Sequence, residues 1–221
     1  MNRVELKNKA KELIKDNKWY ILKPVVMFGL AVMAISIIAY LLDTAFGLTT
    51  NETVMVGKVA FTSHSGGIIT DIVGTLSGLA GGVFGVAYAY YILNFVRGNK
   101  MEMSDIVDWA KKHWVIAILV SLLTGLITIV GFILLVIPGF IAAIGLMFYK
   151  EVCADNPELK ALEIVKKAWN TTNGYKLDLF VLSLSFIGWA ILAVFTFGIL
   201  YIWLAPYMTV TLTLAYEELK K

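Results

Sequence analysis

Four stretches without a charged residue constrain the fold of this chain most strongly, and they cover residues 24–42, 72–96, 115–149 and 179–216. A helix needs about 20 residues to cross a hydrocarbon layer of about 30 Å. The first two stretches therefore predict one crossing each. The other two, of 35 and 38 residues, would form straight helices of about 52 and 57 Å, so we predict that each folds back as a helical hairpin.

Turn signals near the middle of both long stretches support these hairpins, because proline removes a backbone donor and glycine relaxes the backbone. The alternative is that a proline only kinks one long tilted helix. The signals are Gly131 with Pro138-Gly139 in one stretch, and Gly198 with Pro206 in the other.

Composition excludes a soluble domain, since 59% of the 221 residues are hydrophobic and 16% are charged, against about 25% charged in a soluble protein. Cys153 is the only cysteine, which excludes a disulfide or a cysteine-based metal site within one chain. The first 18 residues are too long and too acidic for the start of a signal peptide, so we predict an uncleaved first crossing. Hydrolase, zinc-protease and phosphate-binding motifs are missing from the sequence. We expect no enzyme, no catalytic residue, no cofactor and no metal.

Lysine and arginine mark the cytoplasmic side of a membrane protein. Of the 19 in this chain, seven lie in residues 1–23, four in 97–112, five in 150–176 and two at the C-terminus, and only Lys58 lies elsewhere. If both long stretches are hairpins, 18 of the 19 lie on one face. We therefore predict a multi-pass protein of the cell membrane with both termini in the cytoplasm.

Each cytoplasmic segment also has the 3.6-residue periodicity of an amphipathic helix. In the first segment, Leu6, Ala10, Leu13 and Ile14 share one side, opposite Lys9, Glu12 and Asp16. In the third, Asn156 and Pro157 are predicted as the helix start and Asn173-Gly174 as its end.

The predicted fold class is an all-α polytopic membrane bundle of six transmembrane helices, arranged as three units of a surface helix and a helical hairpin within a single membrane domain, 1–221. We predict surface helices at about 3–17, 103–114 and 157–172, and crossings at about 19–42, 70–96, 115–132, 138–152, 177–197 and 199–217.

The expected partners are anionic lipids of the inner leaflet, because basic amphipathic helices bind such headgroups. A homo-oligomer or a membrane-protein partner is also expected, and nucleic acid is not. The predicted leaflet contacts are lysines on all three surface helices and the tryptophans near their ends: Lys9, Lys11, Lys15, Lys111, Lys112, Lys166, Lys167, Trp19, Trp114 and Trp169.

Small residues in the second crossing form two stripes, Gly74-Gly78-Gly82 and Gly81-Gly85, a spacing that lets helix backbones approach closely. We predict a packing seam, with a homodimer interface or a pore-lining helix as the alternatives. Asp43 and Asp71 lie at the outer ends of the first two crossings. They are either interfacial carboxylates or an outer polar site for a cation or substrate.

Short motifs lie along nearly the whole chain: Arg3-Val4-Glu5-Leu6-Lys7 with Ala10-Lys11, Arg97-Gly98, Pro138-Gly139 with Ala142-Ala143, Phe148-Tyr149 and Pro206-Tyr207. These motifs resemble a family of small integral membrane proteins from Gram-positive bacteria, domain of unknown function 975. More distantly, they resemble the membrane domain attached to some glycerophosphodiester phosphodiesterases. This resemblance implies the six-crossing architecture and supplies no catalytic residues.

Three functions agree with this pattern. The first is a non-enzymatic protein that binds or organises lipid or a membrane partner through its basic surface helices. The second is a small permease or exporter of neutral or apolar compounds. The third is immunity to, or sensing of, an extracellular peptide through the loop 43–66, where residues 53–61 alternate in the manner of a short strand.

Overall fold

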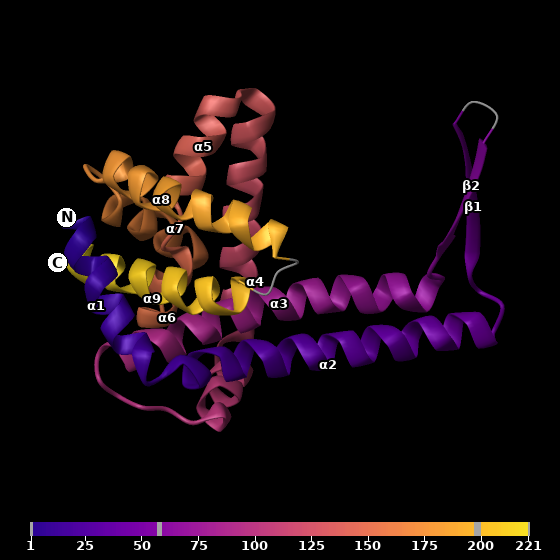
Figure 1. Cartoon of the computed structure of the whole chain (residues 1–221), viewed down its shortest axis with the longest axis horizontal. Helices are drawn as coiled ribbons and strands as arrows, with labels where there is room; N and C mark the ends of the chain where they lie inside the picture. The colour runs from indigo at the N-terminus through magenta and orange to yellow at the C-terminus, as the bar shows by residue number, and fades with distance from the viewer. Residues whose placement is uncertain (1, 57–58, 197–199, 221) are drawn as a thin grey trace. The chain divides into compact units, whose positions relative to one another are not determined.

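The computed structural model describes residues 2–56, 59–196 and 200–220 and is mainly helical (Figure 1). It divides into two compact units, one formed by residues 1–24 and 82–221 and the other by residues 25–81. Length and composition allow five described helical segments to cross a membrane: Lys18–Ala45, Ile68–Val96, Met103–Leu134, Val136–Asp155 and Lys176–Phe195. The predicted all-α membrane fold is confirmed. The sixth crossing, at 199–217, is not among these five and stays a prediction.

The smaller unit contains most of helix α2 (Lys18–Ala45) and the first half of α3 (Ile68–Val96). A two-stranded antiparallel hairpin joins them, β1 (Thr50–Val56) and β2 (Val59–Ser65) (Figure 1). Its register places Thr50 opposite Ser65 and Val56 opposite Val59. The sequence predicted only one short strand in this loop, and residues 57–58 lie outside the described part of the chain.

The Asp43 carboxylate fixes the start of α3 inside this smaller unit. Its oxygens accept hydrogen bonds from the backbone N–H groups of Gly67 (3.0 Å), Ile69 (3.2 Å) and Thr70 (2.8 Å), and from the Thr70 hydroxyl (2.7 Å). The first amides of a helix have no partner within the helix, and a carboxylate there also opposes the positive end of the helix dipole. Asp43 is fully buried while Asp71 is exposed, so the two carboxylates do not form one open site.

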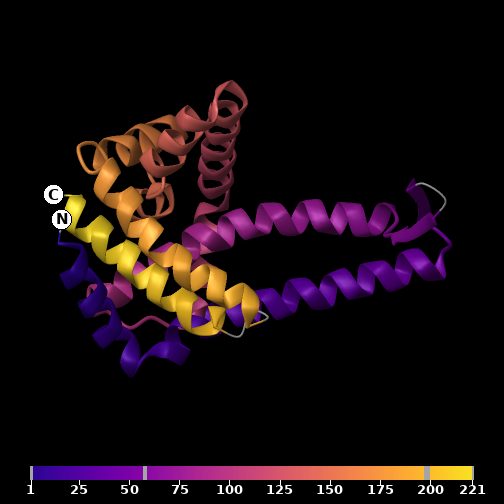
Figure 2. The same ribbon diagram turned by 45° about the horizontal axis from the view of Figure 1, so that its top comes forward.

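The larger unit contains seven helices within the described residues, together with the ends of α2 and α3. They are α1 (Arg3–Lys15), α4 (Met103–Leu134), α5 (Val136–Gly145), α6 (Tyr149–Asp155), α7 (Ala161–Thr171), α8 (Lys176–Phe195) and α9 (Tyr201–Leu219). Helices α8 and α9 run side by side (Figure 2). In α4 the predicted surface helix and crossing are merged, and His113, with φ −122° and ψ 17°, marks the kink between them.

The stretch 115–149 folds back as predicted. Helix α4 ends at Leu134 and α5 begins at Val136, and the two pack against each other. A Cβ atom at Gly131 would lie 3.1 Å from the Cα atom of Gly139, so both glycines let the two backbones approach closely. The returning arm is broken between α5 and α6, so the predicted crossing 138–152 consists of two short helices.

One predicted helix start and one predicted turn residue are wrong. Asn156 ends α6, where its side chain donates to the backbone oxygen of Val152, and α7 begins only at Ala161. Glu163 accepts a hydrogen bond from the Lys160 backbone N–H at 2.9 Å, which caps α7 from within. Pro206 does not mark the reversal between the last two helices, because it lies inside α9. Gly198, the other predicted turn residue, lies outside the described residues.

Removal of the Asp43 carboxylate should loosen the first turn of α3. In Asp43→Ala we expect backbone amides at Ile69 and Thr70 to exchange hydrogen about tenfold faster or more, because they lose their acceptor. Hydrogen exchange followed by mass spectrometry of peptides covering 66–72 measures this. Asp71→Ala is the matched control, because its exposed carboxylate lies in the same turn. Equal exchange in both variants would contradict the capping role.

Candidate functional site

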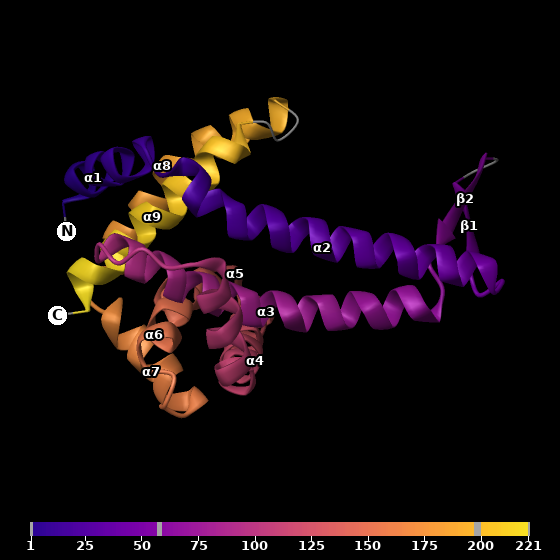
Figure 3. The same cartoon turned by 90° about the horizontal axis from the view of Figure 1, so that it is seen from below.

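Helix α1 lies against α9 and supplies the polar side of the candidate site (Figure 3). Its first turn is capped by Asn2, whose side-chain oxygen accepts from the Glu5 backbone N–H at 3.3 Å. The predicted apolar stripe faces inward, since Leu6, Ala10 and Ile14 are buried. Burial of this stripe holds α1 on the rest of the unit and fixes the direction in which its charged side chains leave the helix.

Three lysines at the edge of α1 and the start of α2 lie over aromatic rings of α8 and α9. The Lys7 ammonium is 4.8 Å from the ring centre of Phe186, Lys11 is 5.8 Å from Tyr207, and Lys18 is 5.9 Å from Trp203. These distances are within the range of cation–π attraction. The Lys7 ammonium also donates to the Ser185 hydroxyl at 2.5 Å. The lysines thus point along the α8–α9 surface.

A pocket of about 400 Å³ opens between α1 and α9. Three lysines and one glutamate give its rim a net positive charge, and two aromatic rings with one isoleucine form its apolar side. The lining residues are Lys11, Lys15, Lys18, Glu12, Ile14, Trp203 and Tyr207. A positive rim above an aromatic floor suits a ligand that carries an anionic group on an apolar body.

The charge pattern around Lys7 adds to this positive field. Burial, together with the nearby positive charges of Lys11 and Arg3, lowers the pKa of the Lys7 ammonium. Arg3 is partly balanced by Asp178 at the start of α8, at 3.8 Å. An anion bound beside Lys7 and Lys11 would relieve their mutual repulsion.

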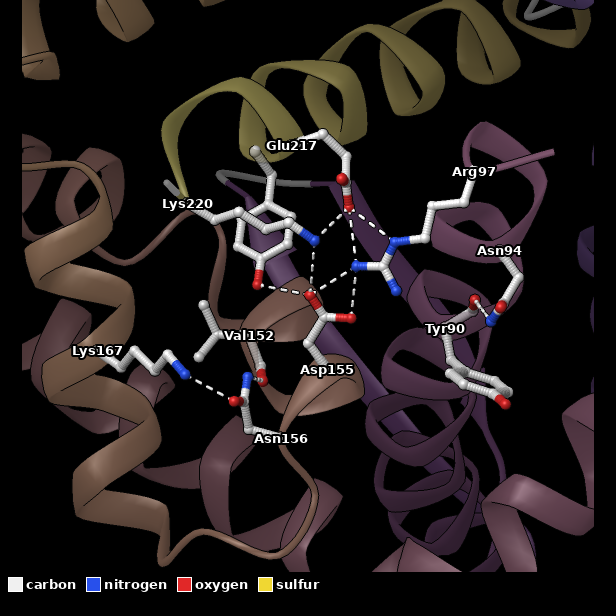
Figure 4. A network of polar contacts seen from close by, with 10 residues as sticks. Tyr90, Asn94, Arg97, Val152, Asp155, Asn156, Lys167, Glu217 and Lys220 are labelled. Carbon is white, nitrogen blue, oxygen red and sulfur yellow. Dashed lines mark hydrogen bonds and ion pairs between the residues drawn. The ribbon is translucent and has the colours of Figure 1, made fainter. Parts of the chain in front are cut away.

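A second cluster joins the ends of three helices (Figure 4). Arg97 follows α3 and donates to Asp155 at the end of α6 (2.6 and 2.7 Å) and to Glu217 near the end of α9 (2.8 and 3.0 Å). Lys220 contacts the same two acids at 3.2 and 2.7 Å, and the Tyr216 hydroxyl donates to Asp155 at 3.0 Å. We call these five residues the helix-end cluster.

The helix-end cluster is neutral and internally satisfied. Partial burial alone would lower the pKa of the Arg97 guanidinium, but its hydrogen bonds with Asp155 and Glu217 raise that pKa above the usual value. The four charged side chains are only 17–31% exposed. Two cations thus neutralise two acids, so the cluster holds helices together and leaves no net charge to attract a ligand.

A second cavity, of about 480 Å³, lies next to the helix-end cluster. Lys9 and Arg97 line it together with three acids, so its charges are mixed. The acids are Glu5, Glu217 and Glu218. This mixture makes the cavity less suited to an anionic ligand than the pocket around Lys11.

The structure separates the predicted leaflet contacts into two groups. Lys11 and Lys15 share the pocket, while Lys9 lines the mixed cavity. The lysines of the other two surface helices do not line the pocket: Lys111 pairs with Asp108 at 3.8 Å, Lys167 donates to Asn156 at 2.6 Å, and Lys112 and Lys166 are exposed. Trp19 and Trp114 are mostly exposed, and the half-buried Trp169 lies under the Lys176 ammonium. Whether these side chains contact lipid stays a prediction.

Among the described residues, the glycine stripes of α3 contact other helices only toward the C-terminal half of α3, at Gly82 and Gly85. A Cβ atom at Gly82 would lie 3.4 Å from the Ser121 side chain, and one at Gly85 would lie 3.3 Å from the Lys150 side chain. At Gly74, Gly78 and Gly81 a Cβ atom would meet nothing within 4 Å. Gly82 and Gly85 thus make room for side chains of α4 and α6, and a seam along the whole stripe stays a prediction.

Reasoning from sequence missed the residues that complete both sites. The aromatic floor, Trp203 and Tyr207, was assigned to a crossing, and the acids Asp155 and Glu217 were not singled out. The sequence does contain one signal for the helix-end cluster: a charged residue lies at or just after the end of the second, fourth and sixth predicted crossings. The pairing of Lys11 with Tyr207 had no local signal, because the two residues are almost 200 positions apart.

Comparison with known families agrees with the resemblance seen in the motifs. A family model described as "Protein of unknown function (DUF975)" matches residues 121–221. No curated protein and no solved structure matches the chain. The family match covers the second half of the chain, from the last part of α4 through α5, α6, α7, α8 and α9, and does not include α1. The more distant resemblance to phosphodiesterase-linked membrane domains is not shown by these comparisons.

Loss of Arg97 should destabilise the larger unit by leaving two partly buried acids without their main donor. For Arg97→Gln we expect the free energy of unfolding to fall by about 1–3 kcal/mol, the range for hydrogen bonds to charged groups. Unfolding of the detergent-solubilised protein in a denaturant series measures it. The control is Lys100→Gln, an exposed lysine three residues later. An unchanged midpoint in Arg97→Gln would contradict the role of the cluster.

Proposed function

We propose that this member of the DUF975 family is a non-enzymatic, multi-pass protein of the cell membrane that binds anionic phospholipid of the inner leaflet. The single observation that carries the proposal is the pocket between α1 and α9, where Lys11, Lys15 and Lys18 surround Trp203 and Tyr207. A phospholipid has the matching chemistry, an anionic phosphate group on an apolar body.

The energies of the individual contacts support a lipid of this kind. Each lysine near an anionic membrane surface contributes about 1 kcal/mol, so three lysines would contribute enough to select anionic over neutral headgroups. Tryptophan and tyrosine prefer the level of the headgroups, where one end of the ring meets water and the other meets hydrocarbon. The pocket combines both kinds of side chain at one place.

The charge distribution supports the placement of this pocket in the inner leaflet. Of the 19 lysines and arginines, 18 lie in the segments that the topology assigns to the cytoplasm. Arg3, Lys7, Lys9, Lys11 and Lys15 all belong to α1. Under this proposal both termini are cytoplasmic, and α1 contacts the leaflet that carries most anionic lipid.

A permease is the second candidate, because four buried polar atoms have no hydrogen-bond partner among the described residues. They are Ser121 Oγ, Thr124 Oγ1, Glu151 Oε2 and Thr213 Oγ1. Glu151 lies just after the uncharged stretch 115–149, and its buried Oε2 places a carboxylate oxygen in the interior of the larger unit. Unsatisfied buried polar groups need an explanation, and a transported polar solute would supply one. Proteoliposomes that take up no neutral, apolar or zwitterionic solute would remove this candidate.

Neutralising the pocket lysines should reduce lipid selectivity. In the full chain we expect Lys11→Gln/Lys15→Gln/Lys18→Gln to retain about tenfold less phosphatidylglycerol relative to phosphatidylcholine. The upper limit is about 150-fold, because the three lysines together contribute at most about 3 kcal/mol of attraction. Native mass spectrometry after extraction from mixed nanodiscs counts the retained lipids.

A matched control separates the pocket from general positive charge. Lys23→Gln/Lys100→Gln/Lys160→Gln removes the same charge from exposed positions that neither line the pocket nor belong to the predicted leaflet contacts, and we expect less than about a twofold change, because long-range attraction is screened by salt. An equal loss in both triple variants, or no loss in the first, would count against the proposed function.

A further inference from the structure

Helices α1 and α9 lie alongside each other over almost their full lengths, in opposite directions. At one end, Leu6 and Lys9 line a cavity with Leu214 and Glu217. At the other end, Lys18 just after α1 lies over Trp203. The contact therefore extends over 15 residues of α9, from Trp203 to Glu217, or about 21 Å of helix. The two helices must lie at similar depths in a membrane.

We propose that α1, α8 and α9 together form a layer that lies at the inner membrane–water interface, so that the α8–α9 hairpin turns back without reaching the outer side. The surface that this layer presents fits the headgroups and upper acyl chains of the inner leaflet. This inference rests on the cytoplasmic N-terminus of the proposed function, and it replaces the expected fifth and sixth crossings.

The many charged residues of α1 are incompatible with a position deep in the membrane. Residues 3–18 contain nine charged side chains. If α9 crossed upright with Glu217 at the inner surface, Tyr207 would lie about 15 Å deep, which is the middle of a hydrocarbon layer of about 30 Å. Lys11 would lie there with it, and Lys18 deeper still beside Trp203. Lysine near the bilayer centre is costly, and snorkelling rescues it only near the ends of a crossing.

Helix α8 has the same relation to α1. The Arg3 guanidinium is 3.8 Å from Asp178, and Lys7 donates to Ser185 and lies over Phe186. Charged groups of α1 thus contact α8 at its start and again at its middle. The opposite side of α8 is exposed and apolar, which suits contact with acyl chains. Its residues are Leu177, Val181, Leu184, Ile191 and Phe195.

The distribution of lysine and arginine does not distinguish the two arrangements. A hairpin that crosses twice and a hairpin that turns back inside one leaflet both return the chain to the side from which it came. The basic segments before α8 and after α9 are therefore cytoplasmic in either case. Helix α9 is not among the five described segments that are apolar and long enough to cross, whereas α8 is one of them. Length and composition therefore allow α8 to cross, and its contacts with the charged side chains of α1 argue for the shallow placement.

Thiol labelling from each side of the membrane tests the proposal. Cys153 is first replaced by Ala, and single cysteines are then placed at Thr196 or Tyr201, two exposed positions at the end of α8 and the start of α9. A membrane-impermeant maleimide is applied to intact cells and to inverted vesicles. We expect both thiols to react at least about fivefold more in inverted vesicles.

Two exposed positions serve as controls: Phe46→Cys, just after α2, reports the outer side of the proposed topology, and Lys100→Cys, just after α3, reports the cytoplasmic side. Labelling of Thr196→Cys or Tyr201→Cys in intact cells at the level of Phe46→Cys would overturn the proposal, and so would lack of reaction from both sides. Exposure of Lys100→Cys in intact cells would instead overturn the cytoplasmic N-terminus on which it rests. Lipid retention by the pocket is measured separately, so failure of one proposal is distinguishable from failure of the other.

Discussion

The cost of placing charge in hydrocarbon is the constraint on which the rest of the structure depends. Leu6, Ala10 and Ile14 bury the apolar stripe of α1 against α9, while the lysines on its edges remain near polar or aromatic partners. Because the stripe is buried, α1 and its partners share one position relative to the membrane. Both proposals, lipid binding in the pocket and a shallow α8–α9 hairpin, depend on that single packing contact.

The helix-end cluster connects one segment from each of the three predicted repeats. Arg97 follows α3, Asp155 lies at the end of α6 and Glu217 lies near the end of α9, and Arg97 donates hydrogen bonds to both acids. Because these charged residues pair with one another, they hold the ends of α3, α6 and α9 next to each other. The division of the chain into three related units stays a prediction, and the segments concerned differ in their helix lengths and in the β-hairpin of the first.

Features that depend on local sequence were predictable. The lengths of the uncharged stretches located the helices, and Gly131 with Pro138-Gly139 located the reversal before α5. The start of α7 was misplaced, because Asn156-Pro157 is a sound cap in isolation and only the Glu163–Lys160 contact reveals the later start. The aromatic floor was not predictable, since it depends on how residues near both ends of the chain meet. Glu151 was passed over because it adjoins Lys150 at the end of an apolar run, where a solvated position is the usual outcome.

The partnership of the first and last helices has a consequence for biogenesis. A ribosome adds about 5–20 residues per second, so α1 leaves the ribosome roughly 10–40 s before α9 exists to receive it. During that interval its apolar stripe has no partner within the chain, and the membrane surface is the nearest apolar phase available. The leaflet would then act as a temporary holder for α1, and completion of the chain would exchange lipid for protein at Leu6, Ala10 and Ile14.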